Sequence, residues 1–292
     1  MMRPAILNLA LALALLLLCP SFAARAAECA PLVTMTTDAL FDGRVLVPVS
    51  LENHPLTMLL DTGSVATTLK WDQARQLKLP TRQSDRSLTA VGGKVLNFTV
   101  AGENFTLGTL RLPNLPIYVE QRNLPGADGT LSSDILRNYD VGLDFTRHRL
   151  SLFAPYGCTA SDAGANVIPL EVAQSGHVRF QVKIGGKTLL AVLDTGAGTS
   201  VMTMKGAAAL GIAPNSPDLV AQPGFGNYHV YAYPFPPLEI GQMTIQNPRI
   251  WIAEDGFLPE KESDLVMGVD AFRHMRLIIG YAQKRLSITP AN

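Results

Sequence analysis

This sequence has few charged residues and few of the side chains that bind metal ions. Charged residues make up 16% of the 292 residues, and 24 basic side chains balance 24 acidic ones. A nucleic-acid-binding protein needs a basic excess to neutralise phosphates, so we expect no nucleic-acid partner. The five histidines and three cysteines show no zinc-ligand spacing, and we expect neither a metal nor a cofactor. The motifs Gly-x-Ser-x-Gly and His-Glu-x-x-His of serine and zinc hydrolases are also absent.

Long apolar runs are equally scarce, and the one that is present lies at the N-terminus. Arg3 precedes the Leu/Ala run 5–18, and Ala24-Arg25-Ala26 supplies small residues for cleavage. This pattern is typical of a secretory signal peptide, so we predict that residues 1–26 are removed. The mature protein would then be exported, periplasmic or secreted, and free of the membrane. An uncleaved N-terminal anchor is the alternative.

Removal of the signal peptide would leave two cysteines, Cys29 and Cys158, because Cys19 departs with it. Two thiols in an oxidising compartment usually pair. We therefore predict a Cys29–Cys158 disulfide that ties the N-terminal strand to the segment between the two halves of the chain. Two free thiols are the alternative.

The second half of the chain repeats the first. Asp61-Thr62-Gly63 recurs as Asp194-Thr195-Gly196, at an offset of 194 − 61 = 133. The flanking apolar segments align at the same offset. After a small insertion within 253–264, the alignment resumes at an offset of 285 − 149 = 136. A repeat of this length predicts two homologous lobes, residues 27–156 and 157–292, joined through a linker at 154–166.

Each half has the pattern of a β-structure. Glycine and proline are plentiful and spread along the chain, which favours many short strands with turns. Short helices are expected at 71–77 and 205–210, and helical turns near Asp134 and Asp270, which we interpret as structural acids. The predicted strands, with turns at 53–55 and 185–187 between them, are 44–51, 57–60, 178–184 and 189–193.

Asp61 and Asp194 each follow an apolar run that predicts a buried strand. A carboxylate there is costly unless it has partners. Gly63 and Gly196 let the backbone turn sharply, and their amides can donate to the carboxylates. If the two loops meet, both carboxylates cannot easily ionise, and the pair holds one proton. One Asp can then activate a water molecule while the other protonates a carbonyl oxygen, which hydrolyses an amide without a covalent intermediate.

These loops resemble those of the pepsin/retropepsin superfamily of aspartic peptidases, and most closely retropepsin-like lobes fused in tandem. Asp61-Thr62-Gly63-Ser64 and Asp194-Thr195-Gly196-Ala197 match forms of its catalytic loop. Leu265-Val266-Met267-Gly268 matches its second signature, which packs beneath that loop. The resemblance implies an all-β, bilobal fold of two β-barrel lobes about a pseudo-twofold axis. It also implies an Asp61/Asp194 catalytic dyad. The repeated loops themselves allow Thr62 and Thr195 to hydrogen-bond across such an axis.

The resemblance further implies one or two flaps over an extended peptide. Val91-Gly92-Gly93 and Gly224-Phe225-Gly226 stand where flap tips would be, so Gly92, Gly93, Phe225 and Gly226 are flap candidates. One departure is Ser132, which occupies the position of Gly268 in the first half. Serine has less backbone freedom than glycine, so the support of the Asp61 loop is an open question.

The function that these patterns predict is that of an aspartic endopeptidase acting on peptides or proteins. Both Asp residues lie in one chain, so a monomer is expected to be active. We see no charged cluster near either Asp loop in the sequence, which predicts apolar side chains on both sides of the cleaved bond. The alternative is a catalytically silent peptide-binding protein on the same bilobal scaffold.

Overall fold

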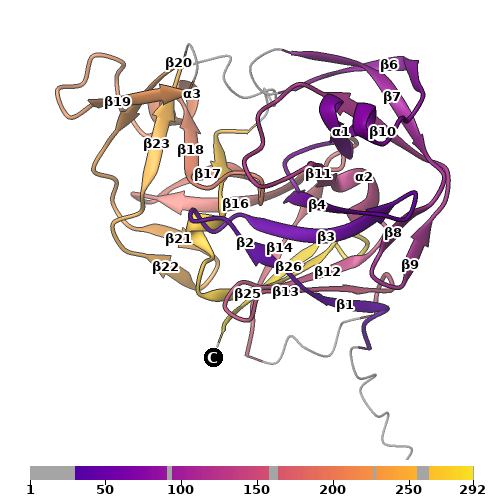
Figure 1. The fold of residues 1–292 in the computed structure, drawn as a ribbon. Coiled ribbons are helices and arrows are strands. Elements are labelled where there is room, and N and C mark those ends of the chain that lie inside the picture. Colours follow the sequence, from indigo (N-terminus) through magenta and orange to yellow (C-terminus); the bar gives the residue numbers. More distant parts are fainter. Residues whose placement is uncertain (1–29, 91–93, 158–163, 226–227, 255–262, 292) are drawn as a thin grey trace, which may run out of the picture.

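The computed structural model describes residues 30–90, 94–157, 164–225, 228–254 and 263–291. Strands dominate it (Figure 1), and they form two ten-stranded sheets, one from each half of the chain, and one six-stranded sheet. The predicted all-β, bilobal fold is therefore confirmed. Helical segments in these ranges are short, and they are α1 (Trp71–Gln76), α2 (Ser133–Leu136), α3 (Met204–Ala209) and the 3-10 helix η2 (Val269–Ala271).

The two ten-stranded sheets have the same strand order. In the first lobe it is β6 (Thr81–Thr89), β7 (Val95–Gly102), β10 (Leu115–Glu120), β5 (Thr68–Lys70), β11 (Gly129–Ser132), β4 (His54–Asp61), β3 (Val45–Leu51), β8 (Phe105–Leu107) and β9 (Leu110–Leu112), with β2 (Asp38–Ala39) on β3. In the second it is β19 (Val220–Phe225), β20 (Tyr228–Ala232), β23 (Ile250–Ala253), β18 (Ser200–Thr203), β24 (Leu265–Met267), β17 (Lys187–Leu193), β16 (Val178–Ile184), β21 (Leu238–Ile240) and β22 (Met243–Ile245), with β15 (Glu171–Val172) on β16. The sequence repeat is thus a structural repeat, strand for strand.

The six-stranded sheet joins the lobes. Its order is β1 (Val33–Thr36), β13 (Arg149–Phe153), β12 (Asp140–Asp144), β25 (Met275–Gly280), β26 (Arg285–Pro290) and β14 (Asn166–Pro169). At its centre β12 pairs antiparallel with β25, with Gly142 opposite Ile278. Their separation, 278 − 142 = 136, is the repeat offset of this region, so equal positions of the two halves face each other. The pseudo-twofold axis therefore passes between these two residues.

One predicted turn lies earlier than the sequence indicates. The turn between β3 and β4 is formed by Glu52 and Asn53, which have positive φ angles of 50° and 63°. The prediction of 53–55 was wrong because β4 begins at His54, and Pro55 pairs with Ser50 inside the ladder. The matching turn in the second lobe, predicted at 185–187, is formed by Gly185 and Gly186 alone, because Lys187 already begins β17 opposite Ile184.

A hydroxyl relay supports the Asp61 loop from behind. The Thr67 hydroxyl donates to Asp134 Oδ1 at 2.8 Å, and the Thr67 amide donates to Asp134 Oδ2 at 2.9 Å. The Ser132 amide in turn donates to Thr67 Oγ1 at 3.3 Å. Asp134 is therefore a structural acid that fixes the segment between the loop and β5.

The second lobe repeats this relay with different side chains. Ser200 Oγ donates to Asp270 Oδ1 at 2.8 Å, and the Gly268 amide donates to Ser200 Oγ at 3.1 Å. Burial raises the pKa of Asp270 and also that of Asp134. The hydrogen bonds that the two carboxylates accept lower the pKa and so oppose this rise. Their position behind the loops identifies both acids as supports.

Ser132 is accommodated without glycine's backbone freedom. Its φ of −124° and ψ of −177° are those of ordinary extended backbone, and its buried hydroxyl donates to Thr130 Oγ1 at 3.1 Å. At Gly268, by contrast, a Cβ atom would lie 2.7 Å from the Ala197 carbonyl oxygen and 2.8 Å from the Thr199 carbonyl carbon. Space, rather than conformation, therefore demands glycine, and only in the second lobe.

We expect Gly268→Ser to destabilise the protein although the first lobe carries serine at the same position. The new Cβ would overlap backbone atoms that cannot rotate away, which costs about 3 kcal/mol in a packed interior. Ser132→Ala is the matched control, and it should cost about 1 kcal/mol through the loss of one hydrogen bond. Denaturant unfolding of both variants measures the difference, and equal destabilisation would contradict the packing argument.

Candidate active site

Asp61 and Asp194 meet at the interface between the lobes. Asp61 ends β4, Asp194 directly follows β17, and Asp61 is only 6% exposed. A Cβ atom on Gly63 would lie 2.3 Å from Asp194 Cγ, and one on Gly196 would lie 2.5 Å from Asp61 Cγ. Each loop therefore packs its glycine against the carboxylate of the other, an approach that any side chain would block.

Two threonines hold the loops together across the pseudo-twofold axis. The Thr62 amide donates to Thr195 Oγ1 at 3.1 Å, and the Thr195 amide donates to Thr62 Oγ1 at 3.0 Å. Each hydroxyl then donates to a carbonyl of the opposite lobe at 2.8 Å, Thr62 to Leu193 and Thr195 to Leu60. Both side chains are buried, so these bonds are shielded from water. This is the contact that the repeat predicts.

The two carboxyl groups share a hydrogen bond, and their surroundings favour one proton between them. The pKa of Asp61 is raised to about 7, first by burial and then by the nearby charge of Asp194, while the charge of Arg122 opposes the rise. Burial also raises the pKa of Asp194, but the Gly196 amide, 2.8 Å from Asp194 Oδ1, and the hydrogen bond from Asp61 oppose that rise. The Gly196 amide thus favours the anionic form of Asp194.

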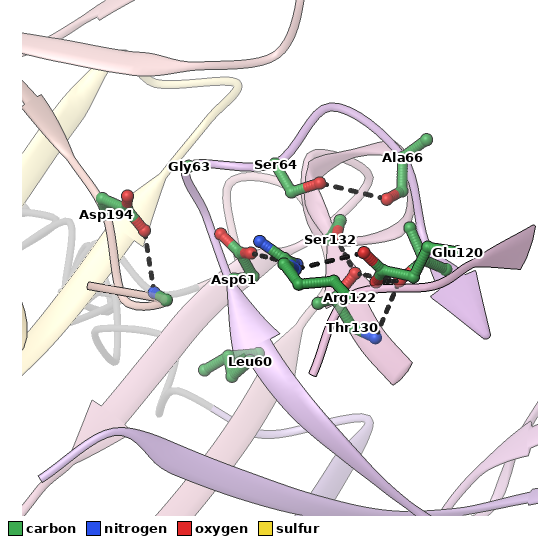
Figure 2. A network of polar contacts seen from close by, with 12 residues as sticks. Leu60, Asp61, Gly63, Ser64, Ala66, Glu120, Arg122, Thr130, Ser132 and Asp194 are labelled. Atoms are coloured by element: carbon green, nitrogen blue, oxygen red, sulfur yellow. Dashed lines mark hydrogen bonds and ion pairs between the residues drawn. The ribbon is translucent and has the colours of Figure 1, made fainter. Parts of the chain in front are cut away.

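A charged pair that sequence reasoning missed lies beside Asp61 (Figure 2). Arg122 Nη2 is 3.9 Å from Asp61 Oδ2, and Arg122 Nε is 3.1 Å from Glu120 Oε2. Glu120 is 2% exposed and also accepts a hydrogen bond from the Thr68 hydroxyl. The expectation that no charged cluster lies near either Asp loop was wrong, because the sheet brings the end of β10 beside the loop after β4. The second half has alanine at the position of Glu120, so the repeat alignment gave no signal.

The dyad lies in a cleft of about 480 Å³ to which both lobes contribute. The first-lobe hairpin contributes Leu88, Thr89, Ala90 and Leu96, next to its flap candidates. Thr62 and Thr195 lie behind the dyad rather than in the cleft. A hollow of about 540 Å³ around β16 contains neither Asp, so it is a separate surface feature. The predicted loop residues that line the cleft are Gly63, Ser64, Gly196 and Ala197.

Several predicted features fall outside the described residues. They include the signal peptide 1–26, both cysteines Cys29 and Cys158, and the flap tips Gly92, Gly93 and Gly226. Phe225 ends β19, but its side chain is not described. Within the described ranges, no group of three His, Cys, Asp or Glu side chains is placed to hold a metal ion. No helix in those ranges is long and apolar enough to cross a membrane.

Comparison with solved structures finds the same fold at low sequence identity. An aspartic proteinase from Irpex lacteus matches with a TM-score of 0.56 and 14% identity, over 88% of this chain and 97% of that one. Basic 7S globulin from soybean matches with a TM-score of 0.53 and 9% identity, over 89% and 95%. Conglutin gamma from lupine seeds matches with a TM-score of 0.52 and 10% identity, over 89% and 95%. One of these three structures is a proteinase and two are basic 7S globulins, so the likeness shows the fold alone.

Comparison with curated proteins found no match. A family model described as aspartyl protease, however, matches residues 47–135 and 180–271. The two matched segments together make up more than half of the chain, and each contains one Asp-Thr-Gly loop. The chain therefore belongs to the aspartyl protease family.

Proposed function

We propose that this protein is an aspartic endopeptidase in which Asp61 and Asp194 act as one acid–base pair. The observation that carries the proposal is the hydrogen-bonded carboxyl pair, with Asp61 buried and Asp194 partly buried, in a cleft between two lobes. A carboxyl pair that holds one proton contains both the base and the acid that amide hydrolysis needs. The substrate class is a peptide or protein segment that lies extended in the cleft.

The chemistry follows from the unequal surroundings of the two acids. Asp194, as the anion, accepts a proton from a water molecule while that water attacks the scissile carbonyl carbon. Asp61 gives its proton to the carbonyl oxygen, and a tetrahedral diol forms. The C–N bond then breaks, the nitrogen leaves with a proton from Asp194, and the diol returns its proton to Asp61. Protons balance over the cycle, and one water molecule is consumed.

One chain supplies the complete site in this proposal. Asp61 and Asp194 come from opposite lobes of a single chain, which the strand pairing of β12 with β25 and the threonine contacts hold together. A monomer therefore needs no second copy to assemble the pair. A catalytically silent peptide-binding protein on the same scaffold is the competing proposal, and the globulins that share the fold give it a specific basis.

The proposal includes export, on the strength of the signal-peptide pattern in residues 1–26. In an oxidising compartment we expect Cys29 and Cys158 to form a disulfide. Periplasmically produced protein is treated with an alkylating reagent without reductant and its mass is measured. We expect the mass of the protein with no alkylated cysteine. Two alkylated cysteines in that sample would contradict the predicted bridge.

We expect the mature protein to cleave members of a random peptide library between pH 3 and 8. Asp61→Asn and Asp194→Asn should each lower cleavage at least 100-fold, because neither carboxyl can be both base and acid, and general acid–base catalysis contributes about 10²–10⁴-fold. Mixing the two inactive variants should restore nothing, because each chain's lobes are already paired. Peptide binding by the wild type without cleavage would favour the silent binding protein, and activity in either single variant would contradict the dyad.

The raised pKa of Asp61 predicts a pH dependence of activity. Cleavage should decline as the pH rises through about 7, where Asp61 loses the proton that it gives to the carbonyl oxygen. The pH profile of kcat/KM for one cleaved library peptide measures this decline. Undiminished activity at pH 9 would contradict a catalytic proton on Asp61.

The same pKa predicts that Asp61→Asn stabilises the fold at neutral pH. The pKa of an Asp in an unfolded chain is about 3.9. Between this pH and 7, Asp61 is therefore protonated in the folded state but ionised in the unfolded state. Wild-type stability must therefore fall over that interval, and a neutral Asn removes this loss. Thermal unfolding should show the variant more stable than the wild type at pH 7 but not at pH 3. A variant less stable than the wild type at pH 7 would contradict the raised pKa.

A further inference from the structure

A continuous polar chain leads from the buried interior of the first lobe to Asp61 (Figure 2). Ser132 Oγ lies 3.1 Å from Thr130 Oγ1, which lies 2.8 Å from Thr68 Oγ1. The Thr68 hydroxyl donates to Glu120, whose other oxygen pairs with Arg122. Arg122 then reaches Asp61. Both side chains line the cleft, but the Arg122 side chain is 33% exposed whereas Glu120 is only 2% exposed.

In the second lobe the counterparts of three residues of this chain are apolar. The counterparts of Thr68 and Glu120 are Val201 and Ala253, at offsets of 201 − 68 = 133 and 253 − 120 = 133. Thr130 corresponds to Val266, at an offset of 266 − 130 = 136. Val201 and Ala253 pack into an apolar cluster with Val230 and Trp251.

The fold of a lobe therefore does not require the polar chain. A carboxylate as buried as Glu120 carries a desolvation cost that an apolar residue avoids, and replacing such pairs with apolar residues is often neutral or stabilising. The first lobe bears this cost at the one place where it sets a cation beside Asp61. The asymmetry points to the reaction rather than to stability.

We propose that Arg122 is a positioning residue for the cleavage reaction, held by Glu120 against Asp61 so that the dyad keeps a single negative charge. This role rests on the peptidase function proposed above. Arg122 acts through Asp61, and no contact between it and the substrate is required. Glu120 acts one step further away, by fixing the direction of the guanidinium.

The other charged groups around the cleft do not supply this cation. Asp42 and Arg44 precede β3 and form their own ion pair at 2.8 Å. His177, just before β16, has its Nε2 2.9 Å from the Gly63 carbonyl oxygen. Arg122, in contrast to Arg44, lies within ion-pair distance of Asp61.

The sign of the effect follows from the charge. A cation beside the dyad favours its ionised forms, and Arg122 lowers the pKa of Asp61 and of Asp194. Glu120 has the opposite but smaller effect on the pKa of Asp61. Without Arg122 both deprotonations of the pair should move to higher pH. The singly protonated, active form would then be lost at acid pH.

The decisive experiment compares Arg122→Gln with the wild type by two readouts. Carbon-13 NMR of aspartate-labelled mature protein follows both carboxyl titrations, assigned through Asp61→Asn and Asp194→Asn. The pH profile of kcat/KM follows the reaction. We expect the first titration step and the acid limb to rise by about 1 pH unit, the lower end of the range for an Asp beside an Arg. Activity on the acid limb should fall about 10-fold, and Arg122→Lys should restore most of it.

Two further variants serve as controls for this experiment. Arg75→Gln removes the same charge from the exposed face of α1, where Arg75 pairs with Asp72, and should leave both readouts unchanged. Arg122→Gln leaves Glu120 buried and uncompensated, so the variant is at risk of misfolding. The double variant Glu120→Gln/Arg122→Gln removes both charges, and it should shift the titration in the same direction but by less.

Wild-type carboxyl titrations in both the single and the double variant would overturn the proposal. So would an activity loss that is equal at every pH with unchanged titrations, because that result assigns Arg122 a structural role alone. If the wild type cleaves no peptide, the peptidase function fails. The NMR titration then still decides whether Arg122 sets the charge of the dyad.

Discussion

Four hydrogen bonds made by Thr62 and Thr195 join the two lobes at the point where their carboxylates meet. Each hydroxyl accepts from an amide of the other loop and donates to a carbonyl of the other lobe. Separating the loops would leave buried donors and acceptors unpaired, at a cost of about 1–3 kcal/mol for each group. The position of the carboxyl pair is therefore fixed by hydrogen bonds between the two threonine hydroxyls and the backbone of the opposite lobe. The shared proton follows from that fixed position, because neither carboxylate can withdraw from the other.

The pseudo-twofold axis explains why equivalent residues of the two halves build the site. It does not explain how the two acids come to differ. Equal positions of the two halves face each other in the shared sheet, as Gly142 and Ile278 do, and in the loops, as Thr62 and Thr195 do. Symmetry alone would make the two acids equivalent, but hydrolysis needs one proton donor and one base. The surroundings break the equivalence. The Gly196 amide favours the anion on Asp194, and the Glu120–Arg122 pair comes from the first lobe and lies within ion-pair distance of Asp61.

The sequence repeat predicts the parts of the molecule that the two halves share. From it come the two lobes, the pairing of the Asp loops, the threonine contact and the structural role of Asp134 and Asp270. The repeat predicts poorly where the halves differ, since the alignment retains common residues and passes over the others. Glu120 and Arg122 belong to that second class, and a search for polar residues opposite apolar ones would have found Glu120 against Ala253. For Ser132, the residue type alone does not reveal whether glycine is required for conformation or for space.

Counting the protons on the dyad tests the central claim most directly, and neutron diffraction from crystals of the mature protein near pH 5 makes that count. The account predicts one deuteron between the two carboxyl groups, bonded to Asp61 and directed at Asp194, with no deuteron on Asp194. Deuterons on both acids, or on neither, would contradict the single shared proton. A deuteron bonded to Asp194 and directed at Asp61 would contradict the assignment of donor and base.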